Sequence, residues 1–288
     1  MPRPGMSVVF TINNRTPEQM ENVFSSFIGQ EYSQMVIVLD RPEQGVAEFS
    51  RRWWDTHPRP GIGRGLAPEF VEIIGDRGWL GPARAWNAGF ARVKSELIYM
   101  ISSEVIQEAG NCSKAIDILS GPPAVVFGFC RDDGPVPLVT AAAGQDPSIV
   151  CSSAIRRPLG FIWAMPTWLI RATGGFDETF MSGYWYDDDD FTFRIWKFGV
   201  PYIFDDSIRG VHQHHDRASL TTPAGQAGIQ RNLAYIRGKH GHEHPWDIAP
   251  KDVAVSDGLA IAFPKVAPDR TAHFDRMLKD REPVQAHP

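Results

Sequence analysis

The sequence predicts an α/β fold in which a mostly parallel, Rossmann-like sheet is flanked by helices. Three observations point to it: short apolar, β-branched runs recur in the first 120 residues, each run ends in polar residues, and helical patterns separate the runs. Alternating strands and helices are typical of parallel sheets. With 288 residues, 43% of them hydrophobic, the chain can bury the sizeable core that such a sheet needs.

The first two strands are each followed by a polar turn and a helical segment. The run Ser7–Ile12 is expected to be a strand, and the helix after it begins with Thr16, whose hydroxyl suits an N-cap. The second run, Gln34–Leu39, stops at Asp40, and a helix is expected from there to about His57. Continuous apolar runs of this kind are typical of strands buried on both faces.

Two further strands are expected before residue 120. The run Phe70–Ile74 is the third, an amphipathic helix over residues 81–94 follows, and the fourth strand, Glu96–Ile101, ends at Ser102-Ser103-Glu104. Because the carboxyl ends of parallel strands share one edge of a sheet, we expect the polar residues that follow these strands to lie together there. A ligand site is therefore predicted at this edge.

The second half of the chain is less regular. Gly and Pro residues break up residues 121–222 into short strands and loops, among them a strand at Pro201–Phe204. A helical pattern returns over Pro223–Lys239, and the tail after Pro264 mixes Pro with charged residues. That tail is expected to form a terminal helix and then a frayed end.

Composition excludes several classes of protein. The net charge of −5, with both signs mixed, leaves no basic patch for nucleic acid. Cys112, Cys130 and Cys151 are widely spaced and contain no Cys-x-x-Cys pair, which argues against a disulfide framework and a cysteine zinc site. No run reaches the roughly 18 apolar residues of a membrane span. The sequence thus predicts a cytoplasmic protein without a membrane span.

Four consecutive carboxylates, Asp187–Asp190, stand between aromatic residues. Adjacent anions repel one another, so a bound cation, a proton-transfer role or a helix start must offset the repulsion. Plain helix capping remains an alternative for this run.

Polar residues at the strand ends indicate a second feature. Asp40 alone would be an ordinary turn residue. Because Arg15 and Glu104 also follow strands, the three together indicate a site for a nucleotide base, a diphosphate and a cation.

Five segments resemble motifs of family 2 glycosyltransferases of the GT-A fold. The resemblance covers about residues 7–240, and its most specific part is the pairing of a Gly-Gly-Phe-Asp-Glu element with a later acidic run. The matching segments are Thr11-Ile12-Asn13-Asn14-Arg15, Asp40 after the second strand, the Gly-x-x-x-Ala-x-Asn-x-Gly segment Gly81–Gly89, Gly174-Gly175-Phe176-Asp177-Glu178, and Asp187–Arg194.

The resemblance implies an enzyme that binds a nucleotide-diphosphate sugar, of UDP or GDP type, and transfers its sugar to a glycan or small-molecule acceptor. Residues 1–120 would then be the nucleotide-sugar-binding half and 121–222 the acceptor-binding and catalytic half of one GT-A domain, with 223–288 a C-terminal helical extension and tail. The implied donor-binding residues are Thr11, Asn14, Arg15, Asp40, Trp86, Asn87, Ser102 and Ser103.

The implied metal ion is Mn²⁺ or Mg²⁺. The family's Asp-x-Asp motif is replaced here by Ser102-Ser103-Glu104, so Glu104 is the expected carboxylate ligand. His212 is the expected histidine ligand and His214 is close behind, because a spacing of two puts both on one side of an extended segment, with His215 facing away. A histidine-only zinc site and a hydrogen-bonded loop cluster are the alternatives.

Catalysis is assigned by the same resemblance. Asp188 matches the general base of an inverting transfer, and Asp187 stands where relatives carry a Glu. The helix end at Asn232 and Lys239 is expected to pack on the site. A nucleotidylyltransferase is disfavoured, because no Gly-x-Gly-Thr-Arg-like loop follows the first strand. A non-catalytic nucleotide-sugar or glycan-binding protein stays open, because Ser102 replaces an expected acid.

Overall fold

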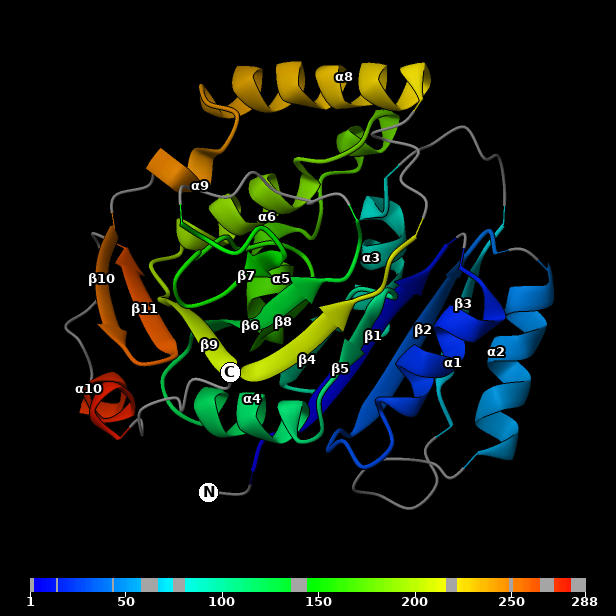
Figure 1. The fold of residues 1–288 in the computed structure, drawn as a ribbon, viewed down its shortest axis with the longest axis horizontal. Helices are drawn as coiled ribbons and strands as arrows, with labels where there is room; N and C mark the ends of the chain where they lie inside the picture. Colours follow the sequence, from blue (N-terminus) through cyan, green and yellow to red (C-terminus); the bar gives the residue numbers. More distant parts are fainter. Residues whose placement is uncertain are drawn as a thin grey trace.

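The computed structural model describes residues 3–13, 15–42, 44–57, 67–74, 81–135, 144–215, 222–248, 251–264 and 272–280. A single sheet runs through this part of the chain and is flanked by helices (Figure 1). The strands are β1 (Met6–Ile12), β2 (Gln34–Asp40), β3 (Glu69–Ile73), β4 (Leu97–Ile101), β5 (Val105–Gln107), β6 (Val125–Asp132), β7 (Ile149–Cys151), β8 (Ile162–Pro166), β9 (Tyr202–His212), β10 (Lys251–Ser256) and β11 (Leu259–Pro264). The helices are α1 (Pro17–Ser25), α2 (Gln44–Thr56), α3 (Ala83–Phe90), α4 (Asn111–Leu119), α5 (Thr167–Thr173), the 3₁₀ helix η1 (Glu178–Ser182), α6 (Asp187–Trp196), α8 (Pro223–His240), α9 (Pro245–Ile248) and α10 (Ala272–Lys279).

The strand order is β10-β11-β9-β6-β8-β4-β1-β2-β3, with β5 paired to β9 and β7 paired to β6 beside this path. Along the path, β8 and β11 run against the other strands, which share one direction. The predicted α/β class, with a mostly parallel sheet flanked by helices, is confirmed. The core is continuous from β1 to α10, so the sheet joins the two halves of the chain.

The first strand and helix form as their local sequence predicts. Every residue of β1 is buried, and β1 pairs in parallel with β2 from Ser7 opposite Gln34 to Ile12 opposite Leu39. Thr16 caps α1: its hydroxyl accepts from the Gln19 backbone N–H at 3.2 Å, while the Gln19 side chain accepts from the Thr16 N–H at 3.0 Å. The two strands therefore end at one edge of the sheet.

The C-terminal part departs from the expected helical extension. The hairpin β10–β11 extends the sheet there, because β11 pairs with β9 from Leu259 opposite Asp205 to Ala262 opposite Tyr202. The turn Asp257-Gly258, with Gly258 at φ 63°, lies between two apolar runs and is a common hairpin signal. The sequence therefore carries the evidence for the hairpin.

Two further elements have boundaries other than those expected. The helix expected over residues 81–94 is shorter, spanning Ala83–Phe90, and β9 continues past Phe204 to His212. The end of the tail, residues 281–288, where fraying is expected, lies outside the described residues. No helix in the described ranges has both the length and the apolar character needed to cross a membrane.

Candidate functional site

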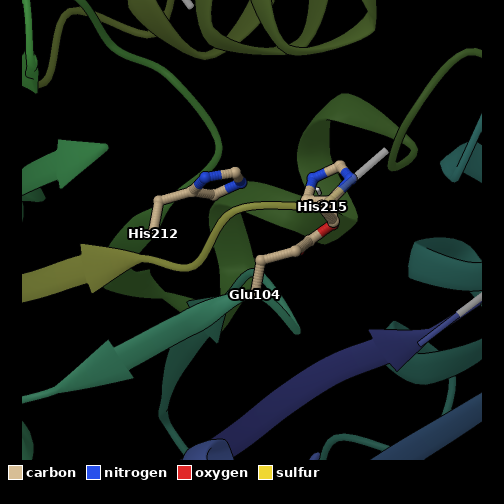
Figure 2. Close-up of side chains that lie close together, drawn as sticks. All are labelled: Glu104, His212 and His215. Carbon is tan, nitrogen blue, oxygen red and sulfur yellow. Dashed lines mark ion pairs between the residues drawn. The ribbon is translucent and has the colours of Figure 1, made fainter. Parts of the chain in front are cut away.

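Glu104, His212 and His215 form a cluster at the edge of the sheet. Glu104 immediately precedes β5, and β5 pairs with β9 so that Val105 lies opposite His212. The ligand atoms of the three side chains all lie within 4.8 Å of one another. Figure 2 shows the Glu104 carboxylate reaching toward the His215 ring, with the His212 ring beside them. The arrangement offers one carboxylate oxygen and two imidazole nitrogens to a single ion.

His215, not His214, completes this cluster. The alternation expected for an extended segment stops because β9 ends at His212, after which the Gln213 backbone N–H donates to the Glu104 carbonyl at 2.8 Å. This bend brings His215 Nε2 to 3.6 Å from Glu104 Oε1, whereas His214 is exposed. The structure thus reverses the expected places of the two histidines.

Asp132 holds the His212 ring, and the sequence analysis missed it. Asp132 lies opposite His212 in the β6–β9 pairing, and its Oδ1 is 3.0 Å from His212 Nδ1, with both residues almost fully buried. A carboxylate on Nδ1 fixes the ring's tautomer and leaves Nε2 for a ligand. The signal that could have identified Asp132 is its place after the apolar run Val125–Phe129.

Three further side chains in the described part of the chain contact Glu104. Arg15 forms an ion pair with its Oε1, and the hydroxyls of Ser102 and Ser103 donate to its Oε2, the latter at 3.4 Å. Burial lowers the pKa of Arg15 to about 10, so the guanidinium is still charged at neutral pH. A metal ion at Glu104 would have to compete with this guanidinium. Asn14, expected beside Arg15, lies outside the described residues.

Thr11 and Asp40 lie at the carboxyl ends of β1 and β2 and are both buried. The Asn13 amide donates to Asp40 Oδ2 at 3.1 Å, and the Arg41 guanidinium donates to Asp40 Oδ1 at 3.0 Å. Asp40 therefore holds two flexible donors in place at the strand end.

Trp86 and Asn87, expected to bind the donor, both contact the loop that contains Gly174 and Gly175. The Trp86 ring stacks on Phe176 at 6.3 Å, and Asn87 exchanges hydrogen bonds with the Phe176 backbone, donating at 3.0 Å and accepting at 2.8 Å. A Cβ on Gly175, which has φ 78°, would come within 2.4 Å of Asn87 Oδ1. The lack of a side chain at Gly175 therefore lets this loop approach α3 closely.

Asp187–Asp190 form the first turn of α6. Asp188 Oδ2 accepts from the Gly160 backbone N–H at 3.3 Å, and its Oδ1 accepts from the Asp189 N–H at 3.0 Å. Burial, followed by the charges of Asp189 and Asp187, raises the pKa of Asp188 well above its ordinary value. Burial and its acidic neighbours also raise the pKa of Asp187 to about 6. A raised carboxylate pKa suits a group that takes up a proton near neutral pH.

The segment Gly160–Phe161 connects Asp188 to the cluster. Gly160 donates to Asp188, while the Phe161 ring meets the His212 ring edge-on, with 5.2 Å between centroids. The Phe161 carbonyl also accepts from the Ser102 N–H at 3.0 Å. The candidate base Asp188 and the candidate metal ligand His212 therefore contact two successive residues of the chain.

Asp190 is a buried ionic centre rather than only a helix-start residue. It accepts from Arg194 Nε at 2.8 Å, and its Oδ1 is 2.7 Å from Lys239 Nζ and 2.8 Å from His240 Nε2. Lys239 also reaches Asp177 Oδ2 at 2.7 Å. Although burial opposes ionisation, hydrogen bonds from Lys239, Thr179 and Tyr235 hold the pKa of Asp177 below its usual range.

Helix α8 lies at the top of Figure 1 above α6. Its Lys239 pairs with Asp177 and with Asp190, and its Asn232 donates to the Phe180 carbonyl. These contacts pack the helix end at Asn232 and Lys239 against the two acidic segments, as expected. The same ion-paired residues keep the loop before α6 and the first turn of α6 in fixed positions.

Comparison with solved structures identifies similar folds. A mannosyltransferase from Pyrobaculum calidifontis, in complex with GDP-Man and Mn²⁺, matches with a TM-score of 0.57 and 18% identity over 81% of this chain and 64% of that chain. TarS 1-349 of S. aureus, in complex with UDP-GlcNAc, matches with a TM-score of 0.58 and 12% identity over 81% and 66%, respectively.

The chain therefore spans slightly less than two thirds of the length of these neighbours. No protein-family model and no curated protein matches it. At these low identities the likeness concerns the fold, and the chain has the α/β fold that these glycosyltransferases share.

Proposed function

We propose that the protein is a metal-dependent, inverting glycosyltransferase that moves a sugar from a UDP- or GDP-linked donor to an acceptor hydroxyl. The observation that carries the proposal is the Glu104, His212 and His215 cluster, joined through Gly160–Phe161 to the half-buried carboxylate of Asp188. The neighbours in complex with GDP-Man and Mn²⁺ and with UDP-GlcNAc support the same class of donor and a divalent ion.

Glu104, His212 and His215 would hold the ion, Mn²⁺ or Mg²⁺, and the chemistry of this donor set fits it. Carboxylate oxygen suits both ions, two imidazoles favour Mn²⁺ over Mg²⁺, and Asp132 already orients His212. When bound, the ion would neutralise charge on the leaving diphosphate. Arg15 adds a second positive charge beside Glu104, and Asp40 would hold Asn13 and Arg41 where the donor's base lies.

Asp188 would act on the acceptor. Its carboxylate takes the proton of the acceptor hydroxyl as that oxygen bonds to the anomeric carbon, and the bond from that carbon to the diphosphate oxygen breaks. The electron pair leaves with the nucleotide diphosphate, and one displacement inverts the anomeric centre. Asp187, whose pKa burial raises to about 6, adds to the local negative charge.

A non-catalytic nucleotide-sugar-binding protein is the second candidate, because Ser102 stands in place of an acid and Arg15 already pairs with Glu104. Thermal unfolding with UDP, GDP and their sugars, each with and without MnCl₂, tests binding, because a ligand of the folded state raises Tm. Release of free sugar from the stabilising donor then separates the two candidates. Tight binding without sugar release would favour the binding protein, and no stabilisation by any donor would contradict both.

His215 and His214 provide a matched pair for the metal site. We expect His215→Ala to weaken Mn²⁺ binding by about 100-fold, because it removes a ligand nitrogen from the cluster and metal sites are sensitive at this level even to their outer-shell partners. His214→Ala should leave it unchanged, because that side chain is exposed. Isothermal titration of the protein with MnCl₂, and with ZnCl₂ for the alternative metal, measures both variants.

Equal losses in the two variants, or a loss confined to His214→Ala, would contradict the placement of the ligands. A site that binds Zn²⁺ and ignores Mn²⁺ would instead favour the zinc alternative, for which a carboxylate with two histidines is also a suitable donor set.

A further inference from the structure

Two successive residues before the acidic turn adopt the left-handed backbone conformation. Trp185 has φ 66° and Tyr186 has φ 69°, and neither is a glycine. Such a conformation costs about 1–2 kcal/mol for a residue with a Cβ. Its persistence at two adjacent positions requires surrounding contacts that hold it, and strain of this kind is concentrated at binding and catalytic sites.

Asn232 of α8 supplies those contacts. Its buried side-chain amide donates to the carbonyls of Phe180, Tyr184 and Trp185, at 2.9, 3.1 and 3.0 Å. The helix lies so close that a Cβ on Gly183 would come within 2.1 Å of the Gly228 carbonyl. The fold therefore contains a specific device that keeps this loop in its strained form.

The strained conformation sends the two aromatic side chains to different environments. Tyr186 is buried against Phe180 and Ile236, whereas Trp185 is 42% exposed. Most tryptophans in the described residues are less than 10% exposed; besides Trp185, the exception is Trp168 at 44%. The Trp168 ring packs edge-on against Phe198, with 6.3 Å between centroids, and no comparable ring contact is recorded for Trp185 in the described part of the chain.

Trp185 is also two residues before the first carboxylate of α6, Asp187, and three residues from Asp188. The negative charge of that turn repels an anionic lipid or a phosphorylated partner. A neutral sugar fits the combination, because its C–H face can stack on an indole while its hydroxyls donate to carboxylates. The occupant that these two features suit together is a carbohydrate.

We propose that Trp185 is a stacking platform for a sugar ring of the acceptor, so that the acceptor is a glycan and Trp185 contributes to its selection. The proposal rests on the function proposed above, with Asp188 as the base that receives the acceptor hydroxyl. Helix α8 holds the Trp185 backbone in place through the hydrogen bond from Asn232 to the Trp185 carbonyl.

The test uses Trp185→Gly, because glycine adopts φ 66° without a steric cost and the fold should be retained. Trp168→Ala is the control, since it removes an equally exposed ring elsewhere. The probes are methyl glycosides of glucose, galactose, mannose and N-acetylglucosamine, with UDP and MnCl₂ present. Saturation-transfer NMR measures their binding to the full chain without any need for turnover.

We expect at least one glycoside to bind the native protein and Trp168→Ala alike, and to bind Trp185→Gly about tenfold more weakly, as the loss of one aromatic contact predicts. Trp185→Phe should restore most of the binding. Unchanged binding to Trp185→Gly, or no glycoside bound by the native protein, would overturn the proposal. Donor hydrolysis by Trp168→Ala should equal that of the native protein; absence of hydrolysis in both, with glycoside binding still dependent on Trp185, would refute transferase activity alone.

Discussion

Replacing Asp188 with asparagine should lower the rate of sugar transfer by about a thousandfold, the effect expected for the loss of a general base. An amide cannot take the acceptor proton, yet its carbonyl oxygen can still accept the 3.3 Å hydrogen bond from the Gly160 N–H. Donor binding should therefore be nearly intact. Initial rates of transfer and thermal shifts with the donor, measured on the same preparation, separate the two effects.

Asp189→Asn is the matched control. Asp189 is the next carboxylate of the same turn; its carboxylate contacts His244 at 3.3 Å, while its backbone N–H, which the substitution keeps, donates to Asp188 Oδ1. This variant should keep most of its activity at pH 8. An Asp188→Asn enzyme with native rates, or an equal loss in both variants, would remove Asp188 from the mechanism.

The same assignment sets the direction of the pH dependence. A base must be ionised to act, and burial with neighbouring charges raises the pKa of Asp188 and brings that of Asp187 to about 6. The rate should therefore fall as the pH drops through this raised range, well above the ordinary pKa of an aspartate, about 3.9. Because the two carboxylates interact, the midpoint belongs to the pair. A constant rate between pH 7 and pH 4 would contradict this environment.

Replacing Asp190 with asparagine should give the largest loss of stability, about 3–5 kcal/mol, as is typical when one partner of a buried ion pair is removed. Asp190 is fully buried, and its carboxylate faces Arg194, Lys239 and His240. The neutral amide of an asparagine at position 190 would leave the charges of Arg194 and Lys239 without this carboxylate as their counter-charge. Urea unfolding at pH 7 measures the change in the free energy of unfolding.

Glu243→Gln is the control for Asp190. It breaks the ion pair of Glu243 with Arg237, whose side chain is 57% exposed, and exposed pairs contribute about 0–1 kcal/mol. Similar losses in the two variants would show that the buried charges do not hold α8 on α6.

Asp177 makes the free energy of unfolding sensitive to acid. Its pKa is depressed in the folded state, so its contribution to stability is present above the ordinary pKa of an aspartate. That contribution is lost as the pH falls below the ordinary pKa and toward the depressed one.

Local patterns predicted the framework well. The first four strands and the Thr16 cap follow from apolar runs and hydrogen-bonding chemistry that act within a few residues, so they can be found along the chain. The same holds for the acidic turn at Asp187–Asp190, which begins a helix as its charges favour. The hairpin at Asp257-Gly258 carried an equally local signal that the sequence analysis did not use.

The sequence by itself therefore determined the α/β class, the strand ends that carry Arg15, Asp40 and Glu104, and the place of the acidic run. Only the tertiary structure decided which side chains meet: His215 instead of His214 beside Glu104, Asp132 behind His212, and α8 against the loop before α6. The physical reason is that periodicity orients a side chain only while a strand or helix continues. Past its end, packing and charge pairing between distant parts of the chain decide which groups meet, and no local spacing records them.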